Sequence, residues 1–177
     1  MAQQHSACAH RGMTLIELLI TITLIGVLIS LATPSFMDIA ARNRMATAVN
    51  TLLAHLQLAR SEAVKRGLRV TVCPSTDGST CADDAAWHAG YLVTLDGTDS
   101  SAILRASDSS NPAAIEIKSN RSQVTYQPEG TASGSTQTFT FCDRRPQAKT
   151  DDHRKVILSN VGRARVAIPT DTDTCAD

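Results

Sequence analysis

The chain has 177 residues and a formal net charge of zero, because 17 Lys and Arg residues balance 17 Asp and Glu residues. This length suits one domain of ordinary size plus a terminal segment. The neutral total excludes nucleic-acid binding through overall basicity, so any affinity for anions must come from a local cluster of charge. Aromatic residues make up 3% of the chain, which disfavours base stacking as a binding mode.

Residues 13–33 form an almost wholly apolar run with one carboxylate, Glu17. A helix of this length would measure roughly 30 Å, about the thickness of a hydrocarbon core. A charge there is unfavourable by roughly 2.5–3.5 kcal/mol at mid-bilayer, so Glu17 needs an explanation. A plain membrane anchor does not supply one. A secretory signal cleaved after Ala32 is a second interpretation, but its apolar run would be unusually long and would carry an acid.

A third interpretation comes from the residues around Gly12 and Met13, which with Thr14 to Glu17 resemble the cleavage motif of type IV prepilins. That family usually has Phe where this chain has Met13. The resemblance implies a leader, residues 1–12, that prepilin peptidase removes after Gly12, with methylation of the new amino terminus at Met13. It also implies a transmembrane and assembly helix over residues 13–33. In that helix Glu17 would meet the terminal amine of a neighbouring subunit, and pairing would offset much of the penalty of placing charges in lipid.

From residue 35 the pattern becomes amphipathic and remains helical. The apolar residues at helical spacing are Val49, Leu52, Leu53, Leu56, Ala59 and Ala63. Lys65 and Arg66 followed by Gly67 predict a helix end near residue 66. The helix is therefore expected over residues 13–66, with a kink at Pro34 because proline removes a helical hydrogen bond. Residues 34–177 are expected to form the globular domain, which includes the second half of this helix.

After Gly67 the apolar period changes to two, which is typical of strands. Leu68, Val70 and Val72 alternate with polar residues, and Glu129-Gly130 marks a turn. Further strands are predicted at residues 90–95, 102–105, 114–118, 123–127, 136–142, 155–159 and 163–168. The sequence thus predicts an α+β fold in which a long N-terminal helix packs on an antiparallel β domain.

Five cysteines occur, of which Cys8 lies in the expected leader. The other four suit two disulfides in an oxidising compartment, for which the sequence allows three pairings. Cys73 and Cys81 bracket a short polar loop and are expected to pair, which leaves Cys142 with Cys175. Metal coordination is disfavoured because the chain has no CxxC and no histidine at ligand spacing.

Residues 41–66, residues 70–73 and residues 141–145 resemble the GspH/FimT family of minor pilins and pseudopilins. Trp87 and residues 90–95 extend this similarity, which covers most of the chain and is weaker between residues 96 and 135. The resemblance implies a type IV pilin-like fold. It also implies an inner-membrane subunit with a periplasmic domain, which later enters a cell-surface filament. Its partners would be other pilins, prepilin peptidase and the inner membrane.

The C-terminal part carries a local excess of cations on a neutral chain. Between Cys142 and Val166 these cations are Arg144, Arg145, Lys149, Arg154, Lys155, Arg163 and Arg165. On a strand, Arg163 and Arg165 would point to the same face about 6.6 Å apart, and arginine forks suit phosphate oxygens. Gly162 would let the backbone approach a phosphate or make the turn into the strand. Alternatively, Arg163 or Arg165 simply pairs with Asp151 or Asp152.

The residues Gly162-Arg163-Ala164-Arg165 resemble the Gly-Arg-x-Arg motif with which FimT-like minor pilins bind DNA. This resemblance implies sequence-independent binding of double-stranded DNA by Gly162, Arg163 and Arg165. The auxiliaries would be Arg144, Arg145, Lys149, Arg154 and Lys155. Two alternatives stay open, a minor pilin that primes pilus assembly without DNA and an H-type pseudopilin of type II secretion. No catalytic residues and no cofactor are expected, since neither a GxSxG elbow nor a phosphate loop occurs.

Overall fold

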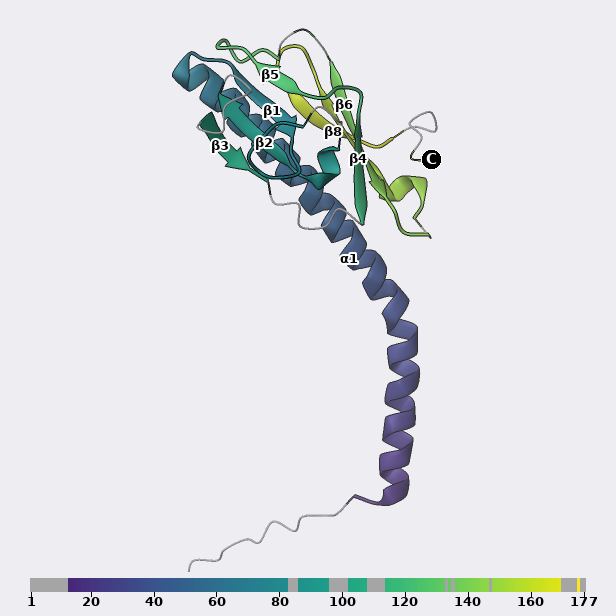
Figure 1. The fold of residues 1–177 in the computed structure, drawn as a ribbon. Helices are drawn as coiled ribbons and strands as arrows, with labels where there is room; N and C mark the ends of the chain where they lie inside the picture. Colours follow the sequence, from purple (N-terminus) through teal and green to yellow (C-terminus); the bar gives the residue numbers. More distant parts are fainter. Residues whose placement is uncertain are drawn as a thin grey trace, which may run out of the picture. The chain divides into compact units, whose positions relative to one another are not determined.

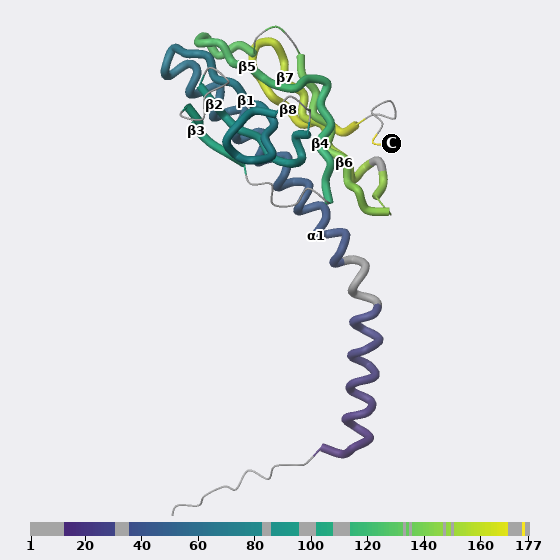
Figure 2. Tube along the Cα trace, viewed as in Figure 1, coloured from purple at the N-terminus to yellow at the C-terminus, as the bar shows by residue number. Residues whose placement is uncertain are grey.

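The computed structural model describes residues 13–82, 86–95, 102–107, 114–132, 134, 136–146, 148–169 and 175, without the side chains of residues 31–35 and 150. The chain divides into two compact units, Met1–Ala41 and Arg42–Asp177. Helix α1, Leu15–Arg66, contributes to both (Figure 1). The kink predicted at Pro34 falls in the stretch whose side chains lie outside the described residues, which is grey in Figure 2.

The first turn of α1 is capped by Thr14. Its Oγ1 accepts a hydrogen bond from the backbone N–H of Glu17 at 3.3 Å. A Thr followed three residues later by Glu is the usual spacing for a helix N-terminus, where an acid also favours the helix dipole. The helix therefore starts at Leu15 instead of residue 13. Large apolar side chains over the described residues 15–29 of this helix are exposed, for example Leu15 at 78% and Ile25 at 53%.

Two antiparallel sheets make up the β part of the second unit, as far as the structure describes it. The first has the order β3-β2-β1-β5, with bounds Ile103–Ala106, Tyr91–Leu95, Val70–Pro74 and Val124–Tyr126. The second has the order β4-β6-β7-β8, with bounds Ile115–Ser119, Gln137–Asp143, Arg154–Leu158 and Ala164–Ala167. Short 3-10 helices occur at η1, Trp87–Ala89, and η3, Thr150–Asp152. Each predicted strand overlaps one of these strands.

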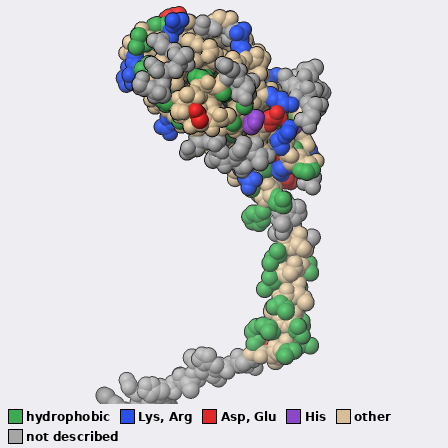
Figure 3. Space-filling view, in the orientation of Figure 1, with side chains coloured by type: hydrophobic (Ala, Val, Ile, Leu, Met, Phe, Trp, Pro, Cys, Tyr) green, Lys and Arg blue, Asp and Glu red, His purple; other side chains and the backbone are tan. Residues whose placement is uncertain are grey.

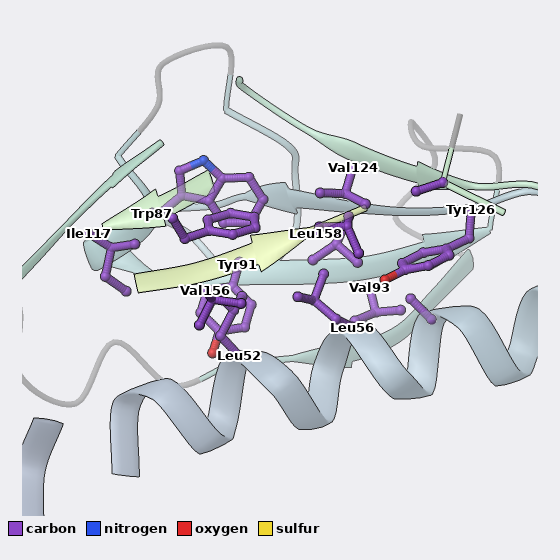
Figure 4. Packing of buried hydrophobic residues seen from close by; sticks show 14 of the residues in the cluster. Leu52, Leu56, Trp87, Tyr91, Val93, Ile117, Val124, Tyr126, Val156 and Leu158 are labelled. Carbon is purple, nitrogen blue, oxygen red and sulfur yellow. The ribbon is translucent and has the colours of Figure 1, made fainter. Parts of the chain in front are cut away.

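The core lies between the C-terminal half of α1 and the inner faces of both sheets. Leu52 and Leu56 are fully buried and point from α1 toward the strands (Figure 4). Val93 of the first sheet and Val156 of the second belong to the same cluster. Burial of each such side chain stabilises the fold by about 1.5–3 kcal/mol. The helix thus joins two sheets that would otherwise each expose an apolar face.

Two disulfides occur among the described residues. Cys73 pairs with Cys81, and Cys142 pairs with Cys175. The second bond fastens a residue of the C-terminal tail to β6, 33 positions earlier. The predicted fold class, a long helix packed on antiparallel sheets with two disulfides, is therefore confirmed.

Candidate nucleic-acid interface

The Gly-Arg-x-Arg residues lie at the hairpin that joins β7 to β8. The backbone N–H of Ser159 donates to the carbonyl oxygen of Arg163 at 3.0 Å, and the N–H of Gly162 donates to the carbonyl oxygen of Ser159 at 2.9 Å. The Ser159 hydroxyl also donates to the Arg163 carbonyl oxygen at 3.1 Å. These bonds close a tight turn over residues 159–163, and we call this turn with β8 the arginine hairpin.

Gly162 makes this turn and packs against the rest of the domain. Its φ is +77°, a conformation that side chains with a Cβ rarely adopt. The residue is buried, and an added Cβ would collide with the carbonyl oxygen of Gly130 and lie 3.1 Å from Cε1 of Tyr126. Of the two roles expected for Gly162, the geometry supports the turn, because a buried backbone offers no approach to a phosphate.

Arg163 and Arg165 are both exposed. Ala164, between them, packs against the core, so strand alternation turns the two arginines away from the core. Arg165 lies in β8, opposite Ile157 of β7. Within the described residues, neither arginine has a carboxylate within 4 Å, and the alternative pairing with Asp151 or Asp152 does not occur there.

Arg144 and Arg145 are held in ion pairs. Arg144 Nη1 lies 2.9 Å from the carboxylate of Glu116, and Arg145 Nη2 lies 2.8 Å from that of Asp143 and 3.7 Å from that of Asp152. Burial raises the pKa of Asp143, but hydrogen bonds from the side chain and backbone of Arg145 and its positive charge outweigh burial, and the pKa stays below its usual value. In both arginines the positive charge is therefore offset by a neighbouring carboxylate.

The remaining predicted auxiliaries are distributed along β7. Arg154 starts that strand and donates from Nη1 to two backbone carbonyl oxygens at 2.6 and 2.7 Å. It is about 16 Å from the turn, at a strand rise of about 3.3 Å per residue. Lys155 pairs in register with Ala167 and is a diagonal neighbour of Arg165 on the outer sheet face. Lys149 is exposed on a separate loop. The structure therefore brings Lys155 near the arginine hairpin and leaves Arg154 distant from it.

Arg60 of α1 also lies at the arginine hairpin, a position that could not be predicted from the sequence. Its Nε is 3.4 Å from the position of a Cβ added to Gly162 and 3.3 Å from one added to Gly130. In the sequence, Arg60 is an ordinary cation on the polar face of a helix. Figure 3 shows that Lys and Arg side chains form several separate groups on the visible face of the globular unit.

The predicted processing residues lie at the other end of the chain. Gly12 falls outside the described residues, whereas Met13 is 62% exposed and Glu17 is in the first turn of α1. Across the residues that the structure describes, no helix meets the length and apolarity expected of a membrane span.

The second unit also contains a cavity of about 340 Å³ beside α1, lined by Trp87, Tyr91 and Ile117 among others. The predicted site residues do not line it. Among the described side chains, no group of three or more His, Cys, Asp or Glu residues is placed to hold a metal ion.

This architecture, a long N-terminal helix whose second half packs on antiparallel sheets, defines a pilin-type subunit. The family model described as type II transport protein GspH matches residues 48–162, more than half of the chain. The prokaryotic N-terminal methylation motif matches residues 8–33. The chain therefore belongs to the GspH family, within the class of minor type IV pilins and pseudopilins.

Individual relatives support this assignment. A pilin-like protein PilA1 of Thermus thermophilus is 30% identical over 169 residues, 88% of this chain and 97% of the relative. A protein of Pseudomonas aeruginosa named fimbrial protein is 32% identical over 97 residues, 54% of this chain and 58% of that relative's length. The crystal structure of the type IV minor pilin FimU of Pseudomonas aeruginosa superposes with a TM-score of 0.57 at 27% identity, covering 71% of this chain and 90% of FimU.

Proposed function

We propose that this chain is a minor pilin of a type IV pilus that binds extracellular double-stranded DNA through its arginine hairpin, for DNA uptake in natural transformation. The observation that carries the proposal is the contrast among the C-terminal cations. Arg144 and Arg145 are paired with carboxylates, whereas Arg163 and Arg165 are exposed and have no carboxylate within 4 Å in the described structure.

Arg163 and Arg165 would act on the phosphate backbone. Each guanidinium donates one or two hydrogen bonds to phosphate oxygens, and neutralising a phosphate releases condensed counterions. Such contacts carry no base information, so binding is independent of sequence and falls as salt rises. Two phosphate contacts correspond to a slope of about −1.8 in log affinity against log salt concentration.

The N-terminal residues would serve processing and assembly. Cleavage after Gly12 by prepilin peptidase leaves Met13 as the methylated terminus. Residues 13–33 then hold the subunit in the inner membrane until assembly with other pilins. Glu17 pairs with the amine of a neighbouring subunit, since an unpaired charge in an apolar filament core is unfavourable. The domain from residue 34 onward presents the arginine hairpin at the cell surface.

Fluorescence anisotropy tests the DNA step. The full oxidised chain, in a nonionic detergent, is titrated onto unrelated labelled duplexes at 50 and 200 mM salt. The Arg163→Gln plus Arg165→Gln variant should lose binding. The matched control, Arg44→Gln plus Arg105→Gln, removes the same charge from two exposed arginines that also have no described ion pair. It should bind like the wild type.

A second candidate is an H-type pseudopilin of type II secretion, which the match to the GspH family model favours. In that case the wild-type chain would show no salt-sensitive binding at 50 mM salt. The chain would then associate with other pseudopilins, and Arg163 and Arg165 would be ordinary surface charges. If both double variants lost binding equally, binding would depend on the total charge of the protein. That result would contradict the assignment of the DNA contact to the arginine hairpin.

A further inference from the structure

Arg60 reaches the arginine hairpin because two glycines leave room for it. Its Nε lies 3.3 Å from a Cβ added to Gly130, and its Cγ lies 3.7 Å from the same position. The corresponding distance from Nε to a Cβ on Gly162 is 3.4 Å. The side chain of Arg60 therefore extends from α1 across the contact between Gly130 and Gly162, where any other residue would fill that space.

The charge of Arg60 is not neutralised by the groups that surround it. Arg60 is exposed and, within the described structure, no carboxylate lies within 4 Å of it. Glu62, on the same helix, is paired with Lys65 and Arg66. Burial raises the pKa of Tyr126, and the nearby charge of Arg60 offsets only part of this effect, so the phenol is neutral at physiological pH. Arg60 is thus a cation available to an external anion.

The geometry also fixes how near Arg60 is to the proposed DNA contact. Gly162 immediately precedes Arg163, and consecutive Cα atoms are about 3.8 Å apart. The glycine that Arg60 approaches is therefore directly bonded to Arg163, with no residue between them. The two arginines come from segments about a hundred positions apart in sequence.

We propose that Arg60 is a third DNA-binding residue, which with Arg163 and Arg165 forms one phosphate-binding surface where α1 meets the arginine hairpin. This inference rests on the proposed function. Gly130 and Gly162 act as positioning residues, since they bring the helix and the hairpin close enough for one phosphate backbone to contact both. A duplex that followed β8 alone would leave Arg60 unused.

The test measures how single substitutions in the full oxidised chain change the fluorescence anisotropy of a labelled duplex of about 20 base pairs. Arg60→Gln removes the charge, Arg60→Met removes it while keeping an apolar stem over the glycines, and Arg60→Lys keeps the charge. Arg44→Gln is the control, because Arg44 is another exposed arginine of α1 without a described ion pair. Thermal unfolding of each variant establishes that the protein is folded at the assay temperature.

Both neutral variants of Arg60 should weaken binding by roughly threefold to tenfold at about 50 mM salt and lower the salt slope by about 0.9. Arg60→Lys should keep the slope, and Arg44→Gln should change neither quantity. If folded Arg60→Met binds like Arg44→Gln while the Arg163 and Arg165 double variant loses binding, the role of Arg60 is refuted and the proposed function stands. A wild-type chain that does not bind DNA would overturn both.

Discussion

Substitution of Gly162 by Ala tests the packing of the arginine hairpin most directly. The added methyl group would collide with the carbonyl oxygen of Gly130 and lie 3.1 Å from Cε1 of Tyr126. The φ of +77° adds strain of about 1–2 kcal/mol for a residue with a Cβ. Overpacking a close contact adds about 1–3 kcal/mol. The expected loss in the free energy of unfolding is therefore about 2–5 kcal/mol.

Gly134→Ala is a matched control for the strain. Gly134 has nearly the same φ, +78°, but an added Cβ would meet no described atom within 4 Å beyond its own chain neighbours. This variant should lose only the conformational part, about 1–2 kcal/mol. At about 2–4 °C per kcal/mol for a chain of this size, Gly162→Ala should lower the Tm by about 4–20 °C, and Gly134→Ala by about 2–8 °C. Circular dichroism of the full chain during heating measures both.

The difference in Tm between Gly162→Ala and Gly134→Ala tests whether the contact with Gly130 is tightly packed. A larger loss for Gly162→Ala isolates the contact with Gly130, since the strain is shared. Equal midpoints would mean that the hairpin moves away from Gly130 without penalty. In that case Gly162 would not be a positioning residue for the shared phosphate-binding surface.

Further predictions concern the core, the disulfides and pH. Leu56→Ala should lose about 2–5 kcal/mol of stability in urea unfolding because Leu56 is fully buried, whereas exposed Val64→Ala should change it by less than about 0.5 kcal/mol. Replacing Cys142–Cys175 by serines should lose about 3.7 kcal/mol and replacing Cys73–Cys81 about 2.5 kcal/mol, because the closed loops span 33 and 8 positions. Equal unfolding free energies for the two variants would contradict this entropic account. The lowered pKa of Asp143 stabilises the fold above about pH 4, and this contribution is lost as pH falls through the folded pKa, so Asp143→Asn should reduce the acid-induced loss of stability.

The elements of the fold could be predicted from sequence because each has its own period. Helical spacing of Leu52, Leu56 and Ala59 predicted the buried face of α1, and all three are buried. The alternation near Leu68 predicted β1, but the strand begins at Val70 and buries every residue. It buries even Thr71, whose hydroxyl is paired with that of Thr125 at 3.0 Å. Alternation indicates one buried face and gives no sign that a central strand is covered on both.

Strand pairing could not be predicted from the same patterns. β1 pairs with β2 on one side and with β5 on the other, so that Val72 contacts Val93 and Val124 in register. Several strands and loops lie between β1 and β5 in sequence. The arrangement in two sheets depends on how α1 covers both inner faces, which is a tertiary condition and leaves no local period.

Whether each arginine forms an ion pair could likewise not be predicted from the sequence. The Gly-Arg-x-Arg residues could be located by their spacing, but whether a neighbouring cation is paired depends on distant carboxylates. Glu116, on β4, pairs with Arg144 across the β4–β6 ladder. Asp152, a candidate partner for the motif, instead pairs with Arg42 of α1 at 3.7 Å and with Arg145. The cluster of C-terminal cations thus separates into paired and unpaired members only once the chain is folded.

The glycine of the motif connects these observations. Of the two roles that the sequence suggests for Gly162, approach to a phosphate or a turn, burial against Gly130 favours the turn. The small size of Gly162 acts on the arginines indirectly. It sets the turn that puts Arg163 on the exposed side of Ala164, and it admits the side chain of Arg60 from α1. The motif therefore has two parts with different physical tasks, since the arginines supply charge and the glycine sets the distance between the two segments that carry it.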